Sequence, residues 1–214
     1  MRTLKVLEML NNGKIEELRA QLQDEVYQDS LKTKPNERKR YIAMKKYFTY
    51  TNMTRECLTK PCKITFEGKD YTSFTNSWSL ALTTEPTGEI ELFDEENGKY
   101  PDIGRLIRFD GVKGKINMSE VIARARTLGY KLTKSEVNPG FRFLMHYDGT
   151  YYKLGLLDAT YSIIDDGEIA TTYHPYGDRM PLTIQTSIGI CMIMPVKFQD
   201  EDIIETEHVV IKVE

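Results

Sequence analysis

The chain has 214 residues, of which 40% are hydrophobic and 29% are charged, and its formal net charge at pH 7 is −3. This composition is typical of an ordinary soluble globular protein and excludes a polycation, so any contact with nucleic acid must come from a local patch. No run approaches the ~20 apolar residues of a membrane-spanning helix, and the N-terminus lacks the continuous apolar core of a signal peptide. The three cysteines form no CxxC pair, which fits a reducing compartment. We therefore expect a cytoplasmic protein that does not associate with a membrane.

The first fifty residues predict two helices and a basic run. Residues 1–30 have apolar side chains at helical spacing (Ile15, Leu18, Leu22, Val26), and a second helix is predicted over residues 37–52. Seven basic residues against one acid lie between residues 32 and 46, whereas the end of the chain, "QDEDIIETEHVVIKVE", is mostly acidic. Each charged run is either a solvated surface or an interaction surface, and the sequence leaves both readings open.

From residue 62 the hydrophobic period changes from near 3.6 to two. The alternation in "CKITFEGKDYTSFTNSWSLALTT" predicts a hairpin that turns at residues 67–70, and short strands are predicted at residues 89–93, 105–109 and 115–118. Asn117 is expected to cap a helix over residues 119–131, with Val121, Ala125 and Leu128 facing inward.

The second half continues the β-rich pattern. A hairpin with Asp148-Gly149 at its tip is followed by a short helix with Leu157, Tyr161 and Ile164 on one face. Three further strands are predicted within residues 168–197, and residues 208–213 are expected to return as a short edge strand. Helices and mostly antiparallel strands in this order predict an α+β fold with both helices of residues 115–197 on one face of the sheet.

The histidines and carboxylates of the chain show no spacing typical of a catalytic or metal site. The three histidines, His146, His174 and His208, have no companions at metal-ligand spacing. The carboxylates between Asp158 and Glu168 could hold magnesium, but "IDDGE" is also typical of a turn that follows a helix. No nucleophile elbow, phosphate loop or dinucleotide fingerprint is present, so we predict a non-enzymatic protein without cofactor or metal.

Three segments resemble the bacterial sliding clamp, the processivity ring of the replicative polymerase. "PLTIQTSIGICMIMPVK" is similar to the last two clamp strands, which end in "MPMR", and "LGLLDATYSII" is similar to the helix before them. "YTSFTNSWSLALTTEP" resembles the clamp segment "LVATDGHRLA", and "NGKYPDIGRLI" resembles the linker "EGRFPDYRRVLP". Trp78 and Ser79 replace the His and Arg of the clamp motif, and an acidic tail continues where a clamp ends. A clamp contains three such domains, so this chain resembles a truncated, divergent clamp, as a phage or mobile element would encode.

The resemblance implies a sliding-clamp-like domain over residues 37–198, preceded by an N-terminal helical extension (1–36) and followed by an acidic tail (199–214). In clamps the three segments line an apolar pocket that binds a short peptide of polymerases and loaders. By this resemblance the function is a clamp-like interaction protein linked to DNA replication, which binds a replication protein or clamp-binding peptide. The implied partner-binding residues are Thr75, Trp78, Leu80, Tyr100, Pro101, Met192, Met194 and Pro195. Methionines at a strand end provide an adaptable apolar floor, although they are equally expected in a plain core.

A second reading is a processivity-type protein that binds duplex DNA, because clamps line their hole with basic helices. One chain of this length would have to form an oligomer to encircle a duplex. The candidate nucleic-acid-binding residues are Lys39, Lys45, Lys46, Arg124, Arg126 and Lys131. An enzyme that uses the carboxylates between Asp158 and Glu168 is the least favoured reading.

Overall fold

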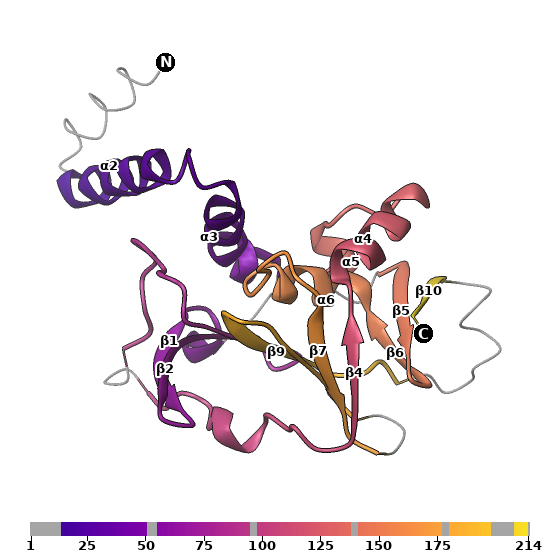
Figure 1. Ribbon diagram of the computed structural model, residues 1–214. Helices are drawn as coiled ribbons and strands as arrows, with labels where there is room; N and C mark the ends of the chain where they lie inside the picture. Colours follow the sequence, from indigo (N-terminus) through magenta and orange to yellow (C-terminus); the bar gives the residue numbers. More distant parts are fainter. Residues whose placement is uncertain are drawn as a thin grey trace.

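The structure is a computed structural model that describes residues 14–50, 55–94, 98–137, 141–176, 180–197 and 208–213 (Figure 1). Its α-helices are α2 (Ile15–Ser30), α3 (Pro35–Tyr47), α4 (Met118–Thr127), α5 (Lys134–Val137) and α6 (Leu154–Tyr161). Short 3₁₀ turns cover Phe48–Tyr50, Glu56–Leu58 and Ile103–Arg105. Within the described residues, no helix is both long enough and apolar enough to cross a bilayer.

A seven-stranded antiparallel sheet is the centre of the fold. Its strands are β1 (Cys62–Phe66), β2 (Lys69–Thr75), β3 (Ser79–Thr83), β4 (Val112–Ile116), β7 (Ala170–His174), β8 (Leu182–Gln185) and β9 (Gly189–Ile193), in the spatial order β1-β2-β3-β9-β8-β7-β4. The first predicted hairpin is confirmed: Phe66 pairs with Lys69, which leaves Glu67 and Gly68 as the turn. Both turn residues have positive φ, as a two-residue hairpin of this type requires.

The two faces of this sheet carry separate core clusters, because successive side chains of a strand point to opposite faces. On one face Phe74, Ala81 and Cys191 belong to the inner cluster, which also includes side chains of α3, α4 and α6. On the other face Leu82 and Ile190 belong to the outer cluster. The outer cluster is completed by residues of the segment that crosses this face, namely Phe93, Tyr100, Ile103 and Ile107.

A smaller sheet packs on the helical side. It consists of β5 (Phe143–Tyr147), β6 (Thr150–Lys153) and β10 (Val209–Val213) in the order β10-β5-β6, and β10 runs parallel to β5. The hairpin at Asp148-Gly149 is confirmed, and both residues have positive φ. The return of the last residues as an edge strand is also confirmed, since β10 pairs with β5 through its whole length. The preceding connection, residues 198–207, lies outside the described residues.

The predicted α+β class, with helices on one face of the large sheet, is confirmed. Helix α6 contacts β3 and β9 of the large sheet and β5 and β6 of the small one, and α4 contacts β10. Side chains of α4 and α6 meet in the inner cluster through Val121, Ala125 and Leu157. The cap of α4 is as expected, because the Asn117 side chain accepts a hydrogen bond from Glu120 N–H at 3.2 Å.

Helix α2 extends away from the sheets and is tied to α3 by polar contacts (Figure 1). Asp24 accepts hydrogen bonds from the Tyr41 hydroxyl at 2.5 Å and from Lys45 Nζ at 2.6 Å. The apolar stripe predicted for this helix is largely uncovered: Leu18 is buried, but Ile15, Leu22 and Val26 are between 48% and 71% exposed. Residues 1–13 of the predicted first helix lie outside the described part of the chain, as do residues 51 and 52 of the second.

Two predicted strands are wrong. Residues 89–93 and 105–109 cross the outer face of the sheet without joining a strand ladder. Phe93 N–H donates a hydrogen bond to Pro61 O, and the ring of Phe93 packs beside Tyr100. Phe109 likewise packs edge-on against Tyr173. The apolar side chains of these segments therefore pack against the folded core although their backbone is not paired in a ladder.

The predicted inward position of Leu128 is also wrong, since this side chain is 54% exposed. Helix α4 ends at Thr127, and Gly129 adopts a φ of 91°, which reverses the chain. Tyr130 N–H then donates a hydrogen bond to Ala125 O, and the Tyr130 side chain, 2% exposed, takes the buried place.

Candidate functional site

The turn between β2 and β3 presents Trp78, the single tryptophan of the chain, to solvent. The Trp78 side chain is 61% exposed, whereas its neighbours Asn76 and Ser79 are buried. Asn76 Oδ1 accepts three hydrogen bonds: from Trp78 N–H (3.1 Å), Ser79 N–H (2.9 Å) and Ser79 Oγ (3.1 Å). Ser77, between them, has a φ of 70°. One buried amide side chain thus holds the backbone on which Trp78 stands.

A buried polar network lies beneath this turn and joins it to two helices. The Ser79 hydroxyl accepts a hydrogen bond from Thr160 Oγ1 of α6 at 2.9 Å and lies 2.9 Å from the Tyr47 hydroxyl of α3. Thr75 Oγ1 donates to Ser79 O at 3.1 Å. Burial raises the pKa of Tyr47, although its hydrogen bond to Ser79 acts in the opposite direction, so Tyr47 stays a neutral donor. Hydrogen bonds on its buried side therefore fix the position of the turn.

The last strand of the large sheet meets the same turn. Met194 N–H donates a hydrogen bond to Trp78 O at 2.9 Å, immediately after β9 ends. Within the ladder, Leu80 of β3 is paired with Met192 of β9. The resemblance implies that the segments of Trp78 and Met194 lie together, and this backbone hydrogen bond confirms that the two segments meet.

The remaining predicted partner-binding residues lie mostly within the fold. Leu80, Tyr100 and Met192 are at most 5% exposed and belong to the outer cluster, against which the half-buried Met194 packs. The Tyr100 hydroxyl donates a hydrogen bond to Ser73 O at 3.1 Å, which fixes the linker on β2. Thr75 and Pro195 are buried, and Pro101 is half-buried. These residues support the turn, and Trp78 is the large apolar side chain that they hold out to solvent.

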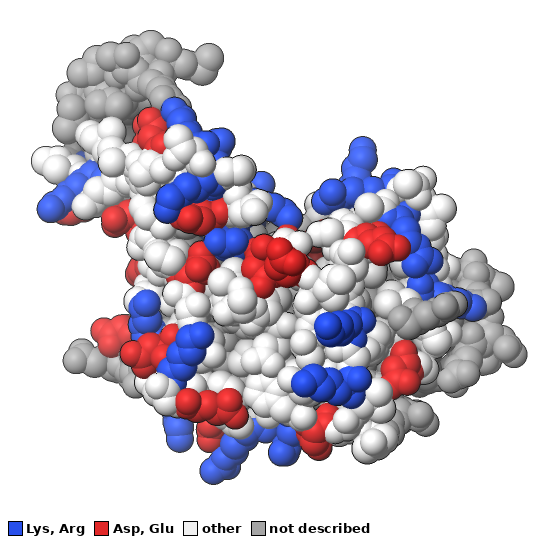
Figure 2. Space-filling model, viewed as in Figure 1, with Lys and Arg blue, Asp and Glu red and all other residues white. Residues whose placement is uncertain are grey.

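The predicted nucleic-acid-binding residues lie in two groups, one on α3 and one around α4, and the two groups differ in their ion pairs. On α3, Lys39 Nζ lies 2.7 Å from Asp165 and Lys45 Nζ lies 2.6 Å from Asp24, while Lys46 is exposed. In the second group, Arg124 of α4 donates a hydrogen bond to the carbonyl oxygen of Lys212. Neither Arg126 of α4 nor Lys131, which follows that helix, forms an ion pair among the described residues. Figure 2 shows Lys and Arg side chains gathered around α4, whereas blue and red side chains are intermixed over α2 and α3.

Two of the carboxylates that suggested an enzyme, Asp158 and Asp166, accept hydrogen bonds within the fold. Asp158 accepts a hydrogen bond from the Tyr130 hydroxyl at 3.0 Å, and burial raises its pKa despite that bond. Burial alone would raise the pKa of Asp166 as well, but hydrogen bonds from the Ser187 N–H and hydroxyl and from Glu168 N–H outweigh it and lower the pKa. In the described ranges no group of three or more His, Cys, Asp or Glu side chains is placed to hold a metal ion.

The histidines are separated in the structure. His174 Nδ1 lies 2.9 Å from the Asp148 carboxylate, and the His146 ring packs against Tyr151. His208 lies beside Phe141, next to the start of β10.

Sequence reasoning missed Asn76 and Ser79 as the residues that position Trp78. The signal that could have found them is an Asn placed two residues before a tryptophan at a strand end, where its side chain can bond the backbone two residues on.

In comparisons with known proteins, the chain matches no protein-family model, no curated protein and no solved structure.

Proposed function

We propose that this chain is a non-enzymatic interaction protein that binds a partner protein by seating a short apolar segment of that partner on Trp78, beside Met194. The observation that supports this function is a 61% exposed tryptophan on a turn whose backbone is fixed by a buried asparagine. Tryptophans are enriched among the residues that carry most of the binding energy at protein interfaces. An exposed tryptophan on an ordered turn is therefore a strong candidate for such an anchor.

The rigidity of the turn favours binding over a purely structural role. Ser77 is held in the left-handed region, which costs a non-glycine residue free energy and persists only when the surroundings impose it. The network of Asn76, Ser79 and Thr160 supplies that constraint. Because the backbone is ordered in advance, a partner loses little further conformational entropy when it docks on Trp78.

The nature of the partner is suggested by the sequence resemblance. The turn at residues 75–80 and the end of β9 are the segments that resemble the peptide-binding parts of the sliding clamp. On this resemblance the partner is a replication protein with a clamp-binding peptide. Duplex DNA is the less well supported partner, because Lys39 and Lys45 are already paired with carboxylates of the chain itself.

Affinity capture from the native cell tests the proposal with three baits: the wild-type chain, Trp78→Ala and the control Tyr176→Ala. Tyr176 is 82% exposed and follows β7, which lies three strands from β3 in the sheet, so the control removes an exposed aromatic ring at a different strand. We expect a protein that is captured by the wild type and by Tyr176→Ala and is lost with Trp78→Ala. Identical captured proteins for all three baits would refute the proposal.

A fluorescence titration then locates the contact. Trp78 is the only tryptophan, so its emission reports on this turn alone. A peptide from the captured partner should shift the emission to shorter wavelength as the indole leaves water. Binding that leaves the emission unchanged would place the interface elsewhere.

A further inference from the structure

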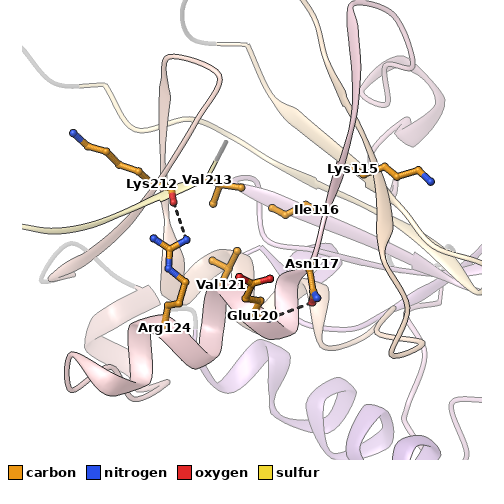
Figure 3. Close-up of a pocket in the computed structure, with 8 residues that line it drawn as sticks. All are labelled: Lys115, Ile116, Asn117, Glu120, Val121, Arg124, Lys212 and Val213. Carbon is orange, nitrogen blue, oxygen red and sulfur yellow. Dashed lines mark hydrogen bonds between the residues drawn. The ribbon is translucent and has the colours of Figure 1, made fainter.

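The seven-stranded sheet ends in an edge strand, β4, that has no strand partner on one side among the described residues. Beside it, a groove of about 450 Å³ lies between β4, the first turns of α4, and β10, which is the edge strand of the small sheet. Figure 3 shows Ile116, Val121 and Val213 directed into this groove, while the ammonium groups of Lys115 and Lys212 extend away from it on either side. An open strand edge beside a groove with a few apolar side chains among charged and polar ones is a geometry that can accept an added strand.

Positive charge dominates this part of the molecule. Residues 112–153 contain eight Lys or Arg and three Asp or Glu, in a chain whose net charge is −3. In the described part of the chain, none of Lys113, Lys115 and Arg124 forms an ion pair with a carboxylate. Glu120 is the carboxylate that lines the groove. The charge here is thus unbalanced within the fold, in contrast to that of α2 and α3.

The two faces of the sheet carry different side chains at β4. Lys113 and Lys115 are exposed and point to one face of the sheet, where Lys113 Nζ lies 5.7 Å from the centre of the Tyr173 ring. By the alternation of a strand, Val112, Gly114 and Ile116 belong to the other face, and Val112 is 41% exposed. A strand added beside β4 would therefore meet lysines on one face and apolar side chains on the other.

We propose that the free edge of β4 binds an extended acidic segment of a partner protein as an additional strand. Acidic side chains of that segment face Lys113 and Lys115, and the alternate, apolar side chains face Val112 and the groove. Main-chain hydrogen bonds to β4 supply affinity, and the period of two supplies specificity.

Charge also excludes the simplest other occupant, a second copy of this chain. Pairing of β4 with β4 of another copy would place Lys113 and Lys115 opposite like charges, which is destabilising. Lysines on edge strands are a common means by which proteins prevent such self-pairing. The same lysines attract an acidic strand, so the edge is open to one class of partner and closed to its own copy.

The probe for the test is a short fluorescein-labelled peptide of alternating Glu and Val, measured by fluorescence anisotropy with the full chain. We expect saturable binding that weakens about tenfold or more with Lys113→Glu/Lys115→Glu, because two attractive pairs become repulsive. The matched control Lys63→Glu/Lys69→Glu changes the charge equally at the opposite edge of the sheet and should leave the affinity unchanged. Glu120→Gln should strengthen binding, since it removes the carboxylate of the groove.

A second probe separates strand addition from simple charge attraction. The same peptide, N-methylated at alternate residues, keeps its charges but loses half of its main-chain donors. One of the two methylation registers should abolish binding and the other should retain it. Equal binding of both registers, equal loss with the control variant, or full displacement by duplex DNA irrespective of methylation would overturn the proposal. Trp78→Ala should not affect this probe, so failure here leaves the function of the Trp78 turn untouched.

Discussion

Replacement of Asn76 by Ala tests how the Trp78 turn is held. The change removes the oxygen that accepts three hydrogen bonds. Trp78 N–H is partly buried and can bind water instead, but Ser79 N–H is buried and loses its acceptor. A buried donor left unsatisfied costs about 1–3 kcal/mol, and the two other bonds add roughly 1 kcal/mol, so we expect a loss of about 2–4 kcal/mol. A domain of typical stability would remain folded.

Urea unfolding followed by far-UV circular dichroism measures this loss. The matched control is Asn36→Ala, because Asn36 is exposed in the first turn of α3 and should change the free energy of unfolding by less than about 0.5 kcal/mol. The anisotropy of Trp78 fluorescence should also fall in the Asn76→Ala variant as the indole gains freedom. Equal unfolding free energies for the two variants, with unchanged anisotropy, would show that Asn76 does not hold the turn.

Three further predictions concern the core and the last strand. Cys191 is fully covered, and burial raises the pKa of its thiol, so a thiol reagent should modify the half-buried Cys57 first and Cys191 only on unfolding. Mass spectrometry of partially labelled protein would check this order. Because burial raises the pKa of Asp158 above its ordinary 3.8, the folded chain holds that proton more tightly than the unfolded chain, and stability falls as pH rises through the raised value. The stability of Asp158→Asn relative to wild type, measured by urea unfolding at several pH values, should thus increase from about pH 3.8 upward and then level off; a constant difference would contradict this sign. Deletion of residues 199–214 removes β10 with the buried Ile211 and uncovers β5, so sedimentation should show more self-association than in the full chain; an unchanged state of association would mean that β10 does not protect that edge.

Local signals predicted much of the fold, and the two wrong strand predictions have a common cause. The hairpins at Glu67-Gly68 and Asp148-Gly149 were predictable because turn residues with positive φ lie between alternating runs. The segments 89–93 and 105–109 show the same alternation, but they lie across the outer face of the sheet. Periodicity reports that one side of an extended chain is buried, and it does not report whether the backbone is paired.

The candidate site was less predictable, because its decisive contacts are long-range. The resemblance grouped Trp78 with Met194, which the backbone hydrogen bond between them bears out. The exposure of Trp78 and the burial of Leu80 could not be derived from alternation, since both lie at one strand end. The pairing of Lys39 with Asp165 joins residues far apart in sequence, so a basic run in the sequence overstated the free charge on α3.

The Trp78 turn and the edge of β4 lie in one rigid sheet but share no residue. Four strand spacings separate β3 from β4, which is about 19 Å at roughly 4.8 Å for each spacing. One short peptide therefore cannot lie on Trp78 and also pair along β4. A partner that carried both an apolar anchor and an acidic extended segment, joined by a flexible linker, could occupy the two sites together, and the second contact would then be intramolecular. Because groups this far apart act independently on stability, the two sites would couple only through such a shared partner.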